Sequence, residues 1–232
     1  MYNELKNRFA KVFKDENNEK EALNNAYADM SRRAQGHNEQ LKNKCFAWLN
    51  ENKIFEEVLN CKSQDEFDEW HKRVCIELKK IHGKFGSIGR SQKVINMAFK
   101  YLSCVSNKYD AILPFCHMTL DGYTLNWYKG IGGKWVAWSK IDDYDEYFEI
   151  QEYIRKYLKN NNEYSITIGK RKTKKLSISH VPFEAEFIIW EGEIIKSKYN
   201  GLIKELNNYK TKGKENDGWL IDDLIDNYLQ SY

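Results

Sequence analysis

The chain has 232 residues, of which 41% are hydrophobic and 14% are aromatic, and its 37 basic and 34 acidic side chains leave a formal net charge of +3. This aromatic content excludes a mainly disordered chain, and the length is sufficient for a core, so we expect one domain over residues 1–232. The weak net charge excludes a protein whose whole surface coats nucleic acid, so any site for a polyanion has to be local.

No stretch approaches the roughly 18 consecutive apolar residues of a membrane-spanning helix, and the start of the chain lacks the apolar centre of a secretory signal. We therefore expect a cytoplasmic protein with no membrane partner. The five cysteines are widely spaced and form no CxxC pair, which argues against a disulfide framework and a zinc site. The sequence predicts neither a metal nor a cofactor.

The first half of the chain is predicted to be helical. Apolar residues recur at intervals of three and four along residues 5–13 and 45–55. Ser63, which two acidic residues follow closely, is typical of a helix start, and the apolar spacing continues from there to about His82.

A glycine-rich turn and a second helix follow. The sequence GKFGSIG at 83–89 is expected to break the first helix, because its three glycines can supply the positive φ angles of a tight turn. On the next helix, expected over about 90–105, Lys93 and Lys100 lie about 20° apart and Asn96 lies about 60° away. This polar stripe is either a binding surface or an ordinary solvated lysine face.

The start of this second helix is suited to a phosphate. Arg90 and Gln92 lie in its first turn, beside backbone N–H groups that have no partner within the helix and carry the positive end of its dipole.

An irregular segment then leads into another helix, which is expected to begin at Thr119 or Asp121. Asp121 is either a helix cap or a carboxylate that is held ionised and oriented for catalysis. His117 is either a structural histidine or a base, and it has no second ligand at helical spacing that would indicate a metal.

The second half is predicted to be helical with one β-hairpin. We expect a Trp- and Gly-rich connection at 126–147, helices at 141–158 and 186–209, a hairpin at 165–179 where polar and apolar residues alternate, and an acidic amphipathic helix at 219–229. The predicted fold is therefore mainly α with a small β-hairpin, arranged as a helical body over 1–138 that 139–232 completes.

Two further features have alternative interpretations. The hairpin tip, which includes Lys170, Arg171 and Lys172, is either a phosphate-binding patch or a solubility feature. The aromatic residues between 127 and 138 are either core or a platform for stacking bases. They are Trp127, Tyr128, Trp135 and Trp138.

A helix, the turn Ser87-Ile88-Gly89, a second helix with Lys93, and a proline-containing loop that ends at Asp121 together resemble the helix-hairpin-helix DNA glycosylases. The separation of this lysine from the aspartate along the chain is most similar to that in the archaeal 8-oxoguanine glycosylase branch. The resemblance covers less than a fifth of the chain. The sequence departs from the family pattern at Ser87, where the family has glycine, and at Pro114, which is not adjacent to the aspartate.

The resemblance implies a helix-hairpin-helix domain that takes a damaged or modified base out of DNA, with Lys93 as the nucleophile and Asp121 as the assisting carboxylate. Such an enzyme is a DNA repair hydrolase with lyase activity, because the lysine forms a Schiff base with the sugar. If this hypothesis is right, we expect substrate contacts from Asn96, Lys100, His117 and Trp127, and DNA contacts from Ile88, Gly89, Arg90 and Gln92 together with the basic hairpin tip at Lys170, Arg171 and Lys172.

Two other classes of function stay open. The chain is alternatively a non-catalytic accessory protein of a phage or a host-defence system that binds nucleic acid or a nucleotide through the same lysine stripe. A third possibility is a protein-interaction domain that docks through the acidic residues Asp222, Asp223 and Asp226.

Overall fold

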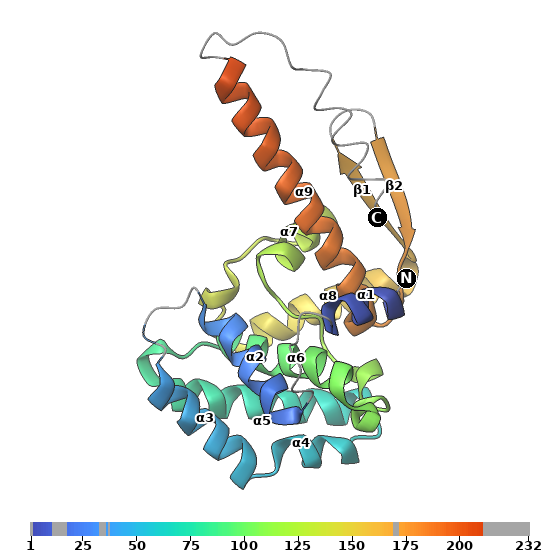
Figure 1. Cartoon of the computed structure of the whole chain (residues 1–232). Helices are drawn as coiled ribbons and strands as arrows, with labels where there is room; N and C mark the ends of the chain where they lie inside the picture. The colour runs from blue at the N-terminus through green and yellow to red at the C-terminus, as the bar shows by residue number, and fades with distance from the viewer. Residues whose placement is uncertain (1, 11–17, 33–35, 37, 169–171, 211–232) are drawn as a thin grey trace.

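The computed structural model describes residues 2–10, 18–32, 36, 38–168 and 172–210. Within these residues the fold is mainly α with a small antiparallel β-hairpin, as predicted (Figure 1). The helices are α1 (Tyr2–Ala10), α2 (Glu19–Ser31), α3 (Glu39–Glu51), α4 (Ile54–Glu57), α5 (Gln64–His82), α6 (Ile88–Val105), α7 (Gly122–Gly130), α8 (Tyr144–Asn160) and α9 (Pro182–Lys210). The acidic segment predicted at 219–229, with Asp222, Asp223 and Asp226, lies outside the described residues.

Helix α6 is the central element of the body (Figure 1). Helices α2, α5, α1 and α8 pack against it, together with the short 3-10 turn η5 (Trp138–Lys140). Of its 18 residues, 14 are buried, including several polar ones. A helix buried to this extent has no broad solvated face, so its polar side chains need partners inside the protein.

Helix α5 begins and ends where the sequence predicts, but only one of the three glycines in the turn that follows it has a positive φ. Ser63 caps α5 by accepting the N–H of Glu66 at 3.2 Å, and Gly83 ends the helix at a φ of 57°. Gly86 and Gly89 do not adopt positive φ. They are required for space instead, because a Cβ at Gly86 would overlap the carbonyl of Lys79 and one at Gly89 would overlap the carbonyl of Trp138.

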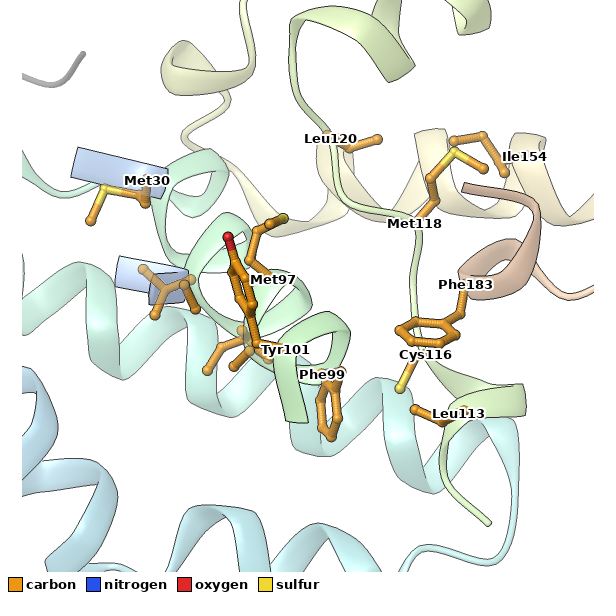
Figure 2. Close-up of a cluster of buried hydrophobic side chains, with 14 of the residues drawn as sticks. Met30, Met97, Phe99, Tyr101, Leu113, Cys116, Met118, Leu120, Ile154 and Phe183 are labelled. Carbon is orange, nitrogen blue, oxygen red and sulfur yellow. The ribbon is translucent and has the colours of Figure 1, made fainter. Parts of the chain in front are cut away.

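The buried apolar side chains form one continuous cluster that extends from Leu5 to Ile195. Figure 2 shows how the loop between α6 and α7 crosses this core, with Met118 directed towards Ile154 on α8. On the other side of α6, Met97 lies near Met30 of α2. The loop that leads to Asp121 is therefore a core segment, although it has no regular secondary structure.

The hairpin packs on α9. Strands β1 (Glu163–Ile168) and β2 (Lys172–Ser177) pair antiparallel, and Tyr164 of β1 is buried where α9 has a glycine, Gly192, that leaves room for its ring. Beyond this contact α9 extends past the body beside the hairpin (Figure 1). Neither α9 nor another helix in the described part of the chain has both the length and the apolar character needed to cross a lipid bilayer.

Candidate functional site

A cavity of about 400 Å³ opens where α2, α6, α7, η5 and α9 meet. Lys93 and Asp121, which lie on opposite sides of the loop between α6 and α7 in the sequence, both line it. Three aromatic side chains and a second carboxylate also line the cavity. They are Tyr123, Trp138, Trp190 and Asp29. This volume lies within the range of small-molecule sites, which is roughly 300–1,000 Å³.

Lys93 presents a free amine to this cavity. Its Nζ lies 4.6 Å from the centroid of the Trp138 ring, and no residue in the described part of the chain forms a hydrogen bond or an ion pair with it. Burial lowers the pKa of Lys93, whereas the negative charges of Asp121 and Asp29 oppose that shift. The lysine is therefore neutral more often than an exposed one, and a neutral amine is a nucleophile.

Asp121 is the N-cap of α7, as one of the two interpretations predicts. Its Oδ1 accepts the N–H groups of Tyr123 and Thr124 at 2.8 and 3.0 Å, and the Thr124 hydroxyl accepts the Asp121 N–H at 2.9 Å. Its Oδ2 accepts the indole N–H of Trp190 at 3.1 Å. These hydrogen bonds together fix the orientation of the carboxyl group at the cavity wall.

The aromatic walls are themselves held in place. Tyr123 meets Trp190 edge-on, with ring centroids 5.9 Å apart, and Trp190 is tied to Asp121. Asp29, on α2, forms an ion pair with Arg32 at 2.5 Å and accepts the hydroxyl of Tyr101. The cavity therefore has fixed aromatic rings in its wall and one oriented carboxylate, Asp121, beside a free amine.

Lys100 does not share the cavity with Lys93. Its Nζ lies 2.8 Å from the carboxylate of Glu186, and both side chains are 2% exposed. The rings of Phe9, Phe187 and Trp190 surround it at 4.9 to 5.2 Å. The prediction of a shared lysine stripe is wrong because α9 covers this side of α6 and supplies a buried partner.

Asn96 and His117 belong to a buried polar network and not to the cavity, so their prediction as substrate contacts is wrong. The Asn96 amide donates to the Tyr147 hydroxyl at 3.0 Å, and His117 lies 2.8 Å from the same hydroxyl. The other ring nitrogen of His117 lies 2.6 Å from Asp68, which also pairs with Arg155. Burial lowers the pKa of His117 to about 4, so the ring is a neutral structural group.

The aromatic residues between 127 and 138 divide into two groups. Trp127 is buried and packs edge-on against Tyr157 at 5.7 Å, so it is a core residue and not a substrate contact. Trp138 is half-buried in the cavity wall, and Trp135 is 50% exposed.

The phosphate contacts predicted at the start of α6 conflict with the structure. The Gly89 N–H donates to the Ile141 carbonyl at 2.9 Å and the Arg90 N–H donates to Ser87 at 3.2 Å, so both donors are already used. The guanidinium of Arg90 binds the Phe85 carbonyl. Ile88 and Gln92 are buried, and the Gln92 amide bonds the backbone of Leu120.

The basic hairpin tip is not part of the described site. Lys170 and Arg171 lie outside the described residues, and Lys172 is described only as the first residue of β2, opposite Ile168.

Several lining residues are absent from the sequence predictions, among them Asp29, Tyr123 and Trp190. Tyr123 could have been found from its place in the first turn after Asp121. The other two have no sequence signal, because they reach the cavity from α2 and α9, which lie far from both Lys93 and Asp121 along the chain.

The described residues contain no group of three or more His, Cys, Asp or Glu side chains placed to hold a metal ion. Comparison of the chain with protein-family models, with curated proteins and with solved structures gives no match, so the site has to be interpreted from its own geometry.

Proposed function

We propose that the cavity is the active site of a DNA N-glycosylase with lyase activity, with Lys93 as its nucleophile. One observation carries the proposal: a lysine amine with a lowered pKa and an oriented carboxylate line the same aromatic-walled cavity. The proposal does not depend on phosphate contacts from the turn at 83–89, whose N–H donors at Gly89 and Arg90 are used within the protein.

The chemistry starts with a nucleotide that is turned out of the DNA stack, which costs a few kcal/mol. The neutral amine of Lys93 attacks C1′ of the sugar, the bond between C1′ and the base nitrogen breaks, and the base leaves with the electron pair. The sugar ring then opens, its oxygen takes up a proton, and the nitrogen of Lys93 forms an imine with C1′. The imine acidifies the hydrogen at C2′; loss of this proton to the departed base anion and departure of the 3′-phosphate with its electron pair cleave the strand, and water then hydrolyses the imine and returns the free amine.

Asp121 and the aromatic walls have separate tasks in this mechanism. Positive charge develops on the sugar as the base leaves, and the carboxylate of Asp121 stabilises it without having to reorient, because its hydrogen bonds already fix it. The rings of Tyr123, Trp138 and Trp190 supply apolar faces on which a base can stack.

Borohydride trapping tests the proposal, because it reduces the imine to a stable covalent bond between the protein and DNA. We expect the native chain to be trapped on DNA that contains an abasic site, with the attachment at Lys93 located by mass spectrometry. Lys93→Gln should lose trapping, and Lys84→Gln, at an exposed lysine outside the cavity, should retain it. Trapping of Lys93→Gln at the native level, or no trapping of the native chain, contradicts the proposal.

A second candidate function is non-catalytic binding of a nucleotide in the same cavity. The observation that favours it is that Asp121 already caps α7 and bonds Trp190, so this carboxylate has a complete structural role. Equilibrium dialysis with nucleoside monophosphates tests it. The expected result is saturable binding that Lys93→Gln weakens, with no trapped product from the native chain.

A further inference from the structure

The last turn of α7 and the segment between α7 and α8 together carry one exposed aromatic ring and three exposed lysines. Trp135 is 50% exposed, and Lys129, Lys134 and Lys140 are exposed as well. Among the described residues, no carboxylate lies within ion-pairing distance of these lysines. We refer to these four residues as the 129–140 surface.

No acidic residue interrupts this segment. The chain has no Asp or Glu between Gly122 and Ile141. The acidic residues on either side of it are engaged elsewhere, since Asp121 caps α7, Asp142 pairs with Lys79 at 2.8 Å and Asp143 caps α8. No acidic side chain within the segment itself offsets the charge of these lysines.

The segment is also held in one conformation. The Gly133 N–H donates to the Tyr128 carbonyl at 2.9 Å, and the Tyr153 hydroxyl donates to the Ile131 carbonyl at 2.8 Å. Gly133 lies against the ring of Tyr128, where a Cβ would overlap it. An exposed tryptophan on a fixed segment can bind a partner without a large ordering cost.

We propose that the 129–140 surface binds an unpaired strand of nucleic acid, with the lysines on its phosphates and a base stacked on Trp135. Three residues beyond Trp135 the same segment reaches Trp138, whose ring centroid lies 4.6 Å from the Lys93 amine in the cavity, and we infer that a strand on this surface runs towards the proposed reaction centre. Single-strand binding by stacking and phosphate contacts tolerates many sequences, which fits a surface that offers no base-reading amide or carboxylate. The placement of the strand next to the nucleophile rests on the proposed function.

An unpaired strand fits this surface better than a lipid bilayer. The exposed large hydrophobic side chains in the described part of the chain are Trp135 and Tyr153, which bonds Ile131 of this segment, and two rings give little apolar area to insert into a membrane. Phosphates along a strand can match separate lysines, and a base has a flat face for the indole.

Binding of a fluorescein-labelled oligo(dT) of about a dozen nucleotides, followed by anisotropy at several salt concentrations, tests the inference. Trp135→Ala should weaken binding about fivefold or more, and Trp135→Phe, which keeps an aromatic face, should weaken it less. The triple variant Lys129→Ala, Lys134→Ala, Lys140→Ala should lower the salt dependence, by about 0.7 in the logarithmic slope for each lysine that contacts a phosphate. Lys44→Ala with Lys62→Ala, at exposed lysines outside this segment, is the matched control and should bind like the native chain.

Native-like oligo(dT) binding by both the Trp135→Ala variant and the triple lysine variant would overturn the inference. Binding of the native chain to vesicles of anionic lipid, with no binding to oligo(dT) or oligo(U), would overturn it as well. If the Trp135→Ala variant and the triple lysine variant lose oligo(U) binding together with oligo(dT) binding, the inference is supported, because both strands offer the same phosphates and stacking faces. Trapping separates the two proposals: if the native chain binds oligo(dT) through Trp135 but is never trapped on an abasic site, the strand-binding surface stands and the glycosylase does not.

Discussion

Asp121 has two roles at the scale of a single residue, and a conservative substitution separates them. Asn is as good a helix cap as Asp, so Asp121→Asn should leave the start of α7 intact while it removes the negative charge from the cavity and the hydrogen bond from the Trp190 indole. We predict that the variant loses glycosidic cleavage by about a hundredfold or more, since the charge that stabilises the sugar cation is gone.

Trapping at a preformed abasic site supplies the control for this prediction. That substrate has no base to remove, so Asp121→Asn should still be trapped through Lys93 at close to the native level. Base release, measured by chromatography, should therefore fall while trapping does not. If both fall together and the circular dichroism is unchanged, Asp121 acts on the amine and not on the sugar.

His117 makes stability depend on pH. Its pKa is lowered from 6.5 to about 4 by burial, so between these values the unfolded chain takes up a proton that the folded chain does not. The free energy of unfolding should be independent of this group above about pH 6.5 and should fall by about 3 kcal/mol as the pH drops to 4. Burial also lowers the pKa of His71, which acts in the same direction.

Urea unfolding at a series of pH values measures this effect. In His117→Gln the side chain no longer titrates, so the decrease in stability between about pH 6.5 and 4 should be smaller than in the native chain, whatever the stability of the variant at neutral pH. Burial raises the pKa of Asp68, but its partners His117 and Arg155 lower it by more, so the net pKa is below the usual value. Protonation of Asp68 therefore reduces the free energy of unfolding only at more acidic pH. An unchanged slope in His117→Gln would show that this histidine is not the titrating group.

Gly89 controls the contact between two elements, α6 and the turn η5. Its N–H donates to Ile141 and its Cα faces the Trp138 carbonyl, so Gly89→Ala has to push the turn away from the helix. We predict a loss of stability of roughly 1–3 kcal/mol, as is typical of overpacking, together with weaker trapping because Trp138 moves off Lys93.

Gly130→Ala is the matched control, since Gly130 lies in α7 with open space around its Cα. That change should be neutral or stabilising by about 0.5–1 kcal/mol, because alanine favours helix over glycine. Thermal unfolding of the two variants measures the difference. A Gly89→Ala variant as stable as Gly130→Ala would show that α6 and η5 are not tightly coupled.

The buried ion pair between Lys100 and Glu186 joins α6 to α9. Lys100→Met leaves the Glu186 carboxylate buried without its counter-charge, and we predict a destabilisation of roughly 3–5 kcal/mol. The double variant Lys100→Met, Glu186→Gln should recover most of this loss, because Gln is neutral and can still accept the N–H of Thr119. A double-mutant cycle by urea unfolding measures the coupling, and additive effects would contradict it.

Much of the element structure could be predicted because its signals are local. Ser63 and Asp121 are caps that act within the first turn of their own helices, and the alternation at 165–179 reflects a hairpin whose partners are adjacent in the chain. The prediction that Lys93 and Lys100 share one polar stripe on α6 is wrong, because the burial of each lysine depends on residues that are distant along the chain. Periodicity shows which side of a helix is apolar, but it does not show that Lys100 meets a glutamate on α9, near the other end of the chain.

The candidate site shows the same limit. Lys93 and Asp121 could be paired from a short resemblance, and both line the cavity, whereas Trp190 reaches it only because α9 returns across the body. The sequence predicts that the backbone N–H of Gly89 donates to a phosphate of DNA. The structure uses that N–H for the Ile141 carbonyl instead, a contact between distant parts of the chain that no local pattern signals.

At the scale of the whole molecule, the two halves of the chain complete each other. Buried polar groups of the first half find their partners in the second, since Lys100 pairs with Glu186, and Asp68 pairs with Arg155. A fragment that ends at residue 138 would expose these groups and much of the apolar cluster. We predict that the fragment 1–138 does not fold alone and that the full chain unfolds in a single transition.

Equilibrium urea unfolding of the full chain, followed by far-ultraviolet circular dichroism and by tryptophan fluorescence, tests this prediction. The two probes should give the same midpoint, because Trp70 in the first half and Trp190 in the second lie on helices that both contribute to the continuous core. The fragment 1–138 should show no cooperative transition and little protection in amide hydrogen exchange. Two separate midpoints, or a folded fragment, would mean that the cavity lies between two independently stable units and that its residues come together only when those units dock.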